Sequence, residues 1–336
     1  MATKELSIGK VRGLQELVNP RGVFTMLEID HRESRRQAMR AESPGVASPE
    51  ALLDRDLLLT RVLAPFASGV LLDPEYGAAR AVGGNALPGS VGLAVSLEAA
   101  DYEGEVGARR TTLIAGWDVG KTKRMGASAA KLLLYYHPEA VTARQQEAIA
   151  EAVAEQCRAY DLPLLLEPMS YEWVPAVPKG SSEFARQRPY VVQDSAMHLT
   201  PLGADVLLAE FPANLQYDSP LEALDQCRKL STATELPWIL VSTGQDYELY
   251  RQEVEIACSG GASGFLAGYS LWQEMTTMPQ EQWEEYAATV VVDRLQTLND
   301  VANAEARSYW PQAPVSQDWL KTYAWEPEPA IEALAD

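Results

Sequence analysis

The stretch ADVLLAEFPANLQYD, residues 204–218, contains the unit from which the fold can be predicted. Its apolar run, residues 206–209, suits a buried β-strand and stops at a carboxylate, Glu210, with Pro212 just beyond. Many α/β enzymes place a reactive group in this way. Seven other segments have the same form, a β-branched or leucine-rich run that ends in polar residues. They are GVFTMLEID (22–30), ASGVLLDPEYG (67–77), VGLAVSLEA (91–99), AAKLLLYYHPE (129–139), LPLLLEPMSYE (162–172), LPWILVSTGQD (236–246) and ASGFLAGYSLW (262–272).

Helix-like stretches lie between most of these segments. Two of them, 48–66 and 138–161, carry apolar residues at helical spacing, and a third, 247–261, ends in a Gly pair that suits a helix C-terminus. Strands that alternate with helices predict right-handed βα units and a parallel sheet. Eight units within about 250 residues fit a single closed (β/α)8 barrel, the TIM barrel. An open doubly wound sheet is the alternative, but EIDHRESRR (28–36) stands where its Gly-rich turn would follow the first strand.

Residues 279–310 predict one or two further helices on the outside of the barrel. We therefore assign residues 1–312, including an N-terminal helix and the C-terminal helices, to one barrel domain. Residues 313–336 form an acidic tail that we expect to be partly disordered. The tail helices also suggest a homodimer.

The amino-acid composition limits which binding partners and which cellular compartment are expected for this protein. With 47 acidic and 28 basic residues the net charge is −19, so a nucleic-acid partner, which needs clustered Lys and Arg, is not expected. No apolar run has the length of a membrane span, and the N-terminus lacks the apolar core of a signal peptide. We expect a cytoplasmic protein without membrane contact. Its isolated cysteines, Cys157, Cys227 and Cys258, are expected to be reduced core thiols.

In such a barrel the active site lies at the C-terminal ends of the strands. Lys131 stands there inside an apolar run, and a buried lysine either loses its proton or pairs with acids. With a depressed pKa it can form a Schiff base with a carbonyl substrate, while neighbouring carboxylates move protons. We therefore assign Lys131, Glu167, Asp30 and Glu210 to catalysis. The substrate-binding candidates are Arg32, Glu75, Glu98, Ser242, Gly244, Gly268 and Tyr269.

Some of these strand-end residues also have a structural interpretation. Lys131 could extend to the barrel rim, Glu167 could serve as its ion-pair partner alone, and Asp73 could cap a turn before Pro74. A carboxylate set could also hold Mg²⁺ or Mn²⁺. Against that, Lys131 and Arg32 would bring positive charge into the same site, and no pair of histidines has ligand spacing. We expect no metal and no cofactor.

The segments EIDHR, LLDPEYG, AAKLLLYY, LLLEPMSYE, ADVLLAEFPAN, VSTG and GFLAGYSLW, taken in this order, resemble the tagatose 1,6-bisphosphate aldolase family. The resemblance spans about residues 15–312. It implies a class I, metal-independent (β/α)8 lyase, with relatives that cleave sulfofructose phosphate. Asp30, Lys131 and Glu167 match the family's catalytic positions, and Arg32, Ser242 and Gly244 match parts of its phosphate site.

The chain departs from the family pattern at two positions. The family's Schiff-base lysine precedes the strand-end glutamate by two residues, and here that position is Leu208. The family's Gly-Arg phosphate element is Gly268-Tyr269, which lacks the bidentate cation. In one mechanism Lys131 replaces the missing nucleophile, as in transaldolases, which carry the imine lysine on a fourth strand. In the other no imine forms, and a protonated Lys131 polarises a carbonyl or enolate oxygen.

The sequence therefore predicts a carbon–carbon lyase of the aldolase class that acts on a small ketose or ketose phosphate. An acid–base enzyme on the same barrel, catalysing enolisation or isomerisation, is one alternative. A catalytically silent sensor of sugar phosphates is another. Retention of Lys131 among several carboxylates favours catalysis, because uncompensated buried charges are costly.

Overall fold

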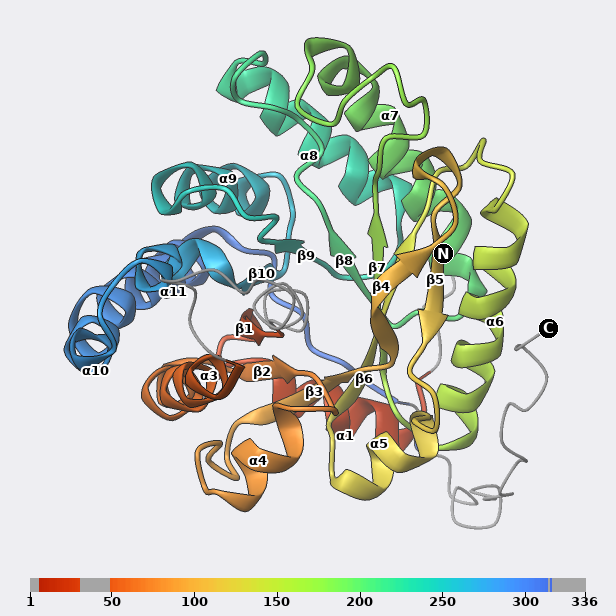
Figure 1. The fold of residues 1–336 in the computed structure, drawn as a ribbon. Coiled ribbons are helices and arrows are strands. Elements are labelled where there is room, and N and C mark those ends of the chain that lie inside the picture. The colour runs from red at the N-terminus through yellow and green to blue at the C-terminus, as the bar shows by residue number, and fades with distance from the viewer. Residues whose placement is uncertain (1–5, 31–48, 314, 316–336) are drawn as a thin grey trace.

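The computed structural model describes residues 6–30, 49–313 and 315, and it confirms the TIM barrel (Figure 1). Eight parallel strands close in the order β1-β10-β9-β8-β7-β6-β3-β2. Each of the eight predicted segments contains one of them. The strands are β1 (Phe24–Ile29), β2 (Gly69–Leu72), β3 (Gly92–Ser96), β6 (Ala129–Tyr135), β7 (Leu164–Met169), β8 (Val206–Ala209), β9 (Trp238–Val241) and β10 (Gly264–Ala267).

The barrel closes where β1 pairs with β10. Phe24 lies opposite Gly264, which has a φ of +141°. A Cβ atom at residue 264 would collide with the carbonyl oxygen of Phe24. Since only glycine combines this backbone conformation with so close an approach, Gly264 is required for closure.

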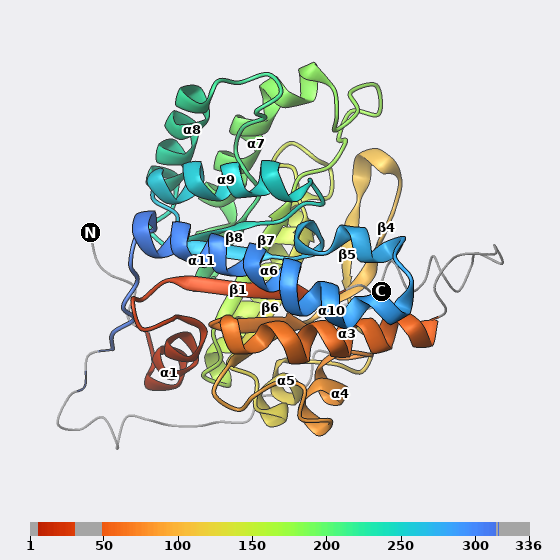
Figure 2. The same ribbon diagram turned by 90° about the vertical axis from the view of Figure 1, so that its left-hand side faces the viewer.

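Helices surround the strands, and α1 lies across the end of the barrel where the strands begin (Figure 2). The C-terminal helices pack against α3 and α9, as expected for an outer cover. The helices are α1 (Ile8–Leu17), α3 (Pro49–Leu63), α4 (Ala78–Gly83), α5 (Val119–Met125), α6 (Ala143–Ala159), α7 (Ser182–Leu199), α8 (Pro220–Ala233), α9 (Tyr247–Ser259), α10 (Trp283–Tyr286) and α11 (Val292–Glu305), with a π-helical turn at Ala287–Val291. The domain boundary at 312 stays a prediction, because most of the proposed tail lies outside the described residues.

Local signals fix where several helices begin. Ser219 caps α8 in a reciprocal capping box with Glu222, and Asp246 caps α9 through the amide of Leu249. The helix expected from residue 138 begins later, at Ala143. Pro138 belongs to the turn that precedes it.

The interior of the barrel is apolar where the strands begin and polar where they end. Leu14 and Leu17 of α1 seal the first end. The apolar interior side chains on the strands are Phe24, Met26, Leu71, Ala94, Ala129, Leu165, Val206, Leu208, Ile239, Val241 and Leu266. Because strand side chains alternate between faces, the next inward positions along several strands are the polar residues of the candidate site.

One element was not predicted. Directly after β3 the chain forms an antiparallel hairpin of β4 (Glu98–Glu103) and β5 (Arg110–Leu113). The hairpin lies on the side toward which the barrel strands point (Figure 2). It therefore forms part of the wall around the candidate active site.

Two expectations from composition can be compared with the structure. Cys157, Cys227 and Cys258 are buried and free, as predicted. Within the described residues, we find no helix with the length and apolarity that crossing a membrane requires.

Candidate active site

Lys131 is the centre of the polar end of the barrel. It stands on β6, where Ala129 faces the interior and Ala130 packs outward against the helices. This alternation directs Lys131 inward. Its Nζ lies 2.9 Å from Oε1 of Glu98 and 2.8 Å from Oε2 of Glu167. The side chain is only 2% exposed, so the alternative in which it extends to the rim is wrong.

The electrostatic environment keeps Lys131 protonated. Burial alone lowers the pKa of this amine, but Glu167, Glu98, Glu28 and Asp30 together raise it well above its ordinary value. Schiff-base formation needs a neutral amine. In this arrangement Lys131 is therefore a fixed cation, suited to stabilising negative charge on a substrate oxygen.

Two carboxyl groups on β1 and its end complete the cluster. Asp30 accepts a hydrogen bond of 3.0 Å from Oγ of Ser96. Glu28 was missed by the sequence analysis, although its position two residues before Asp30 places both on the same face of the strand. Burial, together with the nearby Glu167, raises the pKa of Glu28 to about 8, with Lys131 opposing the shift.

Leu208 occupies the place where a second lysine would enter this cluster. On β8, Val206 and Leu207 lie opposite Leu165 and Leu166 of β7. Leu208 is therefore adjacent to Glu167 on the neighbouring strand. It is fully buried in the barrel interior. Its apolar side chain offers no nucleophile at this position.

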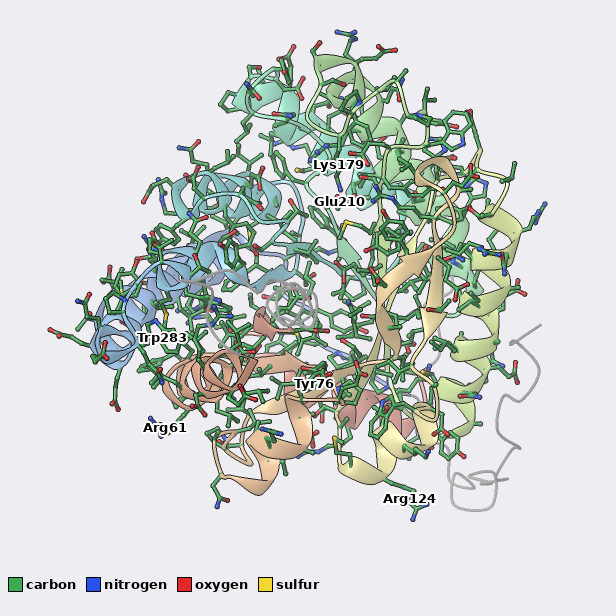
Figure 3. The ribbon with its side chains drawn as sticks, viewed as in Figure 1. Arg61, Tyr76, Arg124, Lys179, Glu210 and Trp283 are labelled. Atoms are coloured by element: carbon green, nitrogen blue, oxygen red, sulfur yellow. The ribbon has the colours of Figure 1, made fainter. Side chains whose placement is uncertain are left out.

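Glu210 is engaged by a lysine that the sequence analysis missed, Lys179. Nζ of Lys179, from the loop between β7 and α7, lies 2.6 Å from Oε1 of Glu210, and the amide of Ser170 donates to Oε2 at 2.7 Å (Figure 3). Burial raises the pKa of Glu210, but Lys179 and Arg188 outweigh it and leave the pKa below its ordinary value. Glu210 is 1% exposed, so it stands as an ionised, paired carboxylate beside the cluster.

The unpredicted hairpin brings a further cation to this end of the barrel. Arg109 pairs with Glu172 at 2.7 Å, and its guanidinium lies 4.4 Å from the ring centroid of Tyr102. The backbone amide of Lys179 also donates to Glu172. This network links the hairpin to the loop that carries the partner of Glu210.

The ends of β9 and β10 carry four of the predicted substrate-binding residues. Ser242 and Ser270 share a hydrogen bond of 2.7 Å between their hydroxyl oxygens. Gly244 has a φ of +93° in an exposed turn, and Tyr269 is 36% exposed. Gly268 lies beside Glu28, because a Cβ at residue 268 would be 3.4 Å from Oε2 of that carboxyl group.

Asp73 and Glu75 follow the end of β2 and belong to the turn before α4. Asp73 is fully buried and accepts from the amide of Tyr76 at 2.6 Å, which confirms its role as a turn cap. Glu75 is exposed on that turn. Arg32 lies outside the described residues. Within the described ranges no group of three or more His, Cys, Asp or Glu side chains is arranged to hold a metal ion, and metal independence stays a prediction.

Comparison with known proteins identifies the family of this chain. The model of a family described as DeoC/LacD family aldolase matches residues 24–274. The chain belongs to the DeoC/LacD aldolase family. It is 29% identical over 327 residues to the tagatose 1,6-diphosphate aldolase of Staphylococcus aureus strain MSSA476, covering 90% of this chain and 98% of that relative. The resemblance noted in the sequence is thereby confirmed.

Solved structures of fructose-bisphosphate aldolases share the fold of this family member. An archaeal fructose 1,6-bisphosphate aldolase superimposes with a TM-score of 0.56 at 18% identity, covering 88% of this chain and 99% of that one. The enzyme from Plasmodium falciparum gives a TM-score of 0.65 at 15% identity, with coverages of 91% and 98%. At these identities the likeness concerns the fold.

Within this aldolase family, the site combines predicted and unpredicted parts. Lys131, Glu167, Glu98 and Asp30 come together as the sequence suggested. Glu210 lies next to them, since its charge acts on Glu167. The alternation of strand β1 could have revealed Glu28. No local pattern could have revealed Lys179, because its contact with Glu210 joins a loop to a strand end 31 residues away.

Proposed function

We propose that this protein is an aldolase-type carbon–carbon lyase that works without a Schiff base. Membership of the DeoC/LacD aldolase family supports the reaction class. The observation that carries the mechanism is the position of Lys131, held between Glu98 and Glu167 with Leu208 where the imine lysine of relatives is expected. Of the two mechanisms open from the sequence, this arrangement favours the protonated lysine.

In this mechanism the ketone oxygen of the substrate binds at the ammonium group of Lys131. Asp30 accepts the proton of the hydroxyl group on the β-carbon. The bond between the α- and β-carbons then breaks, an aldehyde leaves, and the electron pair moves to the ketone oxygen as an enediolate. A fixed cation in a water-poor site stabilises such developing charge more strongly than water does.

Glu98 and Glu167 serve in this scheme to hold Lys131 and keep it charged. Glu98 is satisfied as a carboxylate, because its second oxygen accepts from the amide of Leu133 at 3.1 Å. Asp30 is the more accessible carboxylate and is partly exposed toward the barrel mouth. This difference in exposure supports Asp30, rather than Glu167, as the group that meets the substrate hydroxyl.

The proposed substrate is a small polyhydroxy ketone or its phosphate. The curated relative from Staphylococcus aureus is named for a ketose diphosphate, and the turn at Gly244 exposes backbone of the kind that binds anions. Tyr269 replaces the arginine of the family's phosphate element. A phosphate is therefore expected to contribute less to binding here than in those relatives.

The test combines isotope exchange with chemical trapping. The protein is incubated with dihydroxyacetone phosphate, and separately with dihydroxyacetone, in D₂O, and deuterium at carbon is followed by proton NMR. Parallel samples are reduced with borohydride and searched for lysine adducts by peptide mass spectrometry. We expect exchange without an adduct, and no exchange in the variant Lys131→Met.

Each other result has a clear meaning. An adduct on Lys131 would show that an imine forms and that this lysine replaces the missing nucleophile. Binding of either ketone without exchange or adduct would favour the sensor hypothesis. A preference for dihydroxyacetone phosphate over dihydroxyacetone would identify the phosphate as part of the substrate.

A further inference from the structure

Glu28 is the carboxyl group of the cluster that the proposed mechanism leaves unused. It lies on β1 and its charge interacts with Glu167, Lys131, Asp30 and Glu98. These groups come from β7, β6, the end of β1 and the start of β4. Glu28 therefore faces the same small volume as the fixed cation and the proposed base.

The partners of the four carboxyl groups distinguish Glu28 from the rest. Glu98 and Glu167 each contact the ammonium group of Lys131, and Asp30 accepts from Ser96. Glu28 makes no hydrogen bond or ion pair with any other residue that the structure describes. One cation cannot neutralise four carboxylates that lie so close together, which favours the neutral form for one of them. Within the described residues, Glu28 is the member of the cluster that no hydrogen-bond donor contacts, and only the charge of Lys131 opposes its neutral form.

Glu28 is also within reach of a substrate. Glu28, like Asp30, is partly exposed where the barrel strands end. On the β10 side it borders Gly268, where an added Cβ would lie 3.4 Å from Oε2 of Glu28. A carboxyl group that is enclosed on the strand side and open on the other can exchange a proton with a bound ligand.

We propose that Glu28 is a further catalytic residue, the acid that protonates the enediolate carbon after carbon–carbon cleavage. Its carboxyl O–H bond breaks, the proton forms the new bond to the α-carbon, and Glu28 becomes a carboxylate while the enediolate becomes a ketone. Asp30 holds the proton taken from the hydroxyl group, and returning it to Glu28 two residues away resets the site. No proton is consumed overall. This inference rests on the proposed lyase function.

The acid–base properties of the group agree with this role. Burial and the surrounding carboxylates raise the pKa of Glu28 to about 8 despite the opposing effect of Lys131. The group is thus protonated at neutral pH. A general acid is most effective when its pKa lies near the working pH.

The first experiment measures protonation without reference to activity. The protein is labelled with ¹³C at the glutamate side-chain carboxyl carbon, and the Glu28 signal is assigned from its absence in Glu28→Gln. We expect this signal to titrate between pH 7 and 9, well above the ordinary glutamate pKa of about 4.3. A midpoint below pH 6 would overturn the proposal.

The second experiment measures the proton transfer. Exchange of the carbon-bound hydrogen of dihydroxyacetone phosphate in D₂O runs the step backwards, so Glu28 must be ionised to accept the proton. We expect the wild-type exchange rate to rise with pH through about 8 and to fall about 100-fold or more in Glu28→Gln. Glu28→Asp, which keeps an acid at this position, should recover part of the rate.

A control variant separates this role from a general effect of altering a buried carboxyl group. Glu253 on α9 is also buried, and burial raises its pKa to about 7, but its neighbours are Gln245, Arg188 and Asp246. Glu253→Gln should exchange at the wild-type rate. Exchange in Glu28→Gln at the wild-type rate and pH profile would overturn the role of Glu28 alone. Absence of exchange in the wild type would overturn the lyase proposal with it.

Discussion

Replacing Lys131 with methionine should destabilise the protein at alkaline pH far more than at acidic pH. Its two contacts, 2.8 and 2.9 Å long, each correspond to a gross attraction of about 6 kcal/mol at an effective dielectric constant of about 20. The cost of desolvating the ions offsets much of this. Removing one partner nevertheless leaves buried carboxylates uncompensated, and such changes cost about 3–5 kcal/mol.

The sign of the pH effect follows from Glu167. Burial raises its pKa, and Lys131 is the first of the groups that oppose this. Without Lys131 the folded-state pKa of Glu167 rises further above the unfolded value. A carboxyl group of this kind favours the folded state while protonated and loses that contribution as pH rises through its folded pKa. We therefore expect the full 3–5 kcal/mol loss at pH 8 and a much smaller loss at pH 5.

The assay is urea unfolding of the wild type and the variant at both pH values. Lys10→Met is a matched control, because Lys10 is another buried lysine, 2.7 Å from Asp205, at the opposite end of the barrel. It should lose stability while keeping deuterium exchange, whereas Lys131→Met should lose both. A Lys131→Met variant as stable as the wild type at pH 8 would refute the argument that the lysine compensates the cluster.

Three further predictions test neighbouring parts of the site. Leu208→Lys should yield a borohydride-trapped adduct of dihydroxyacetone phosphate at position 208, and failure to trap it would contradict the placement of this side chain beside the substrate. Lys179→Met should lower the urea-unfolding free energy by about 1–3 kcal/mol, because Glu210 is left buried with fewer donors, and adding Glu210→Gln should restore part of it. Gly268→Ala places a methyl group 3.4 Å from Oε2 of Glu28, at van der Waals contact distance. It should unfold like the wild type but exchange deuterium more slowly.

The barrel was predictable because one pattern repeats along the chain. Eight apolar runs, each followed by polar residues, have the same physical meaning wherever they occur, a buried parallel strand that ends at a common mouth. Lys131 and Glu167 were identifiable for the same reason, since a charge inside such a run must lie inside the barrel. The hairpin β4–β5 was missed because DYEGEVGARRTTL, residues 101–113, is polar and carries no clean alternation.

The roles of individual residues needed three-dimensional contacts. Sequence could name Lys131 but left open whether it is neutral or charged, because the answer depends on two carboxylates within 3 Å. The sequence placed Glu210 in the site but gave no sign of its partner Lys179. The conformation of the loop between β7 and α7 brings Nζ of Lys179 to Oε1 of Glu210. The sequence analysis overlooked Glu28, although the alternation of side chains along residues 24–30 puts Glu28 on the same face as Asp30.

The replacement at position 208 and the charge state of Lys131 are physically connected. An apolar side chain beside Glu167 keeps water and competing cations away from its carboxylate. In that low-dielectric setting the attraction between Glu167 and Lys131 strengthens, and the lysine holds its proton more tightly. A lysine at 208 would instead share the same carboxylates and weaken that hold. Leu208 thus removes the nucleophile expected from relatives and also favours the alternative, a permanent cation at Lys131 with a neutral acid, Glu28, close by.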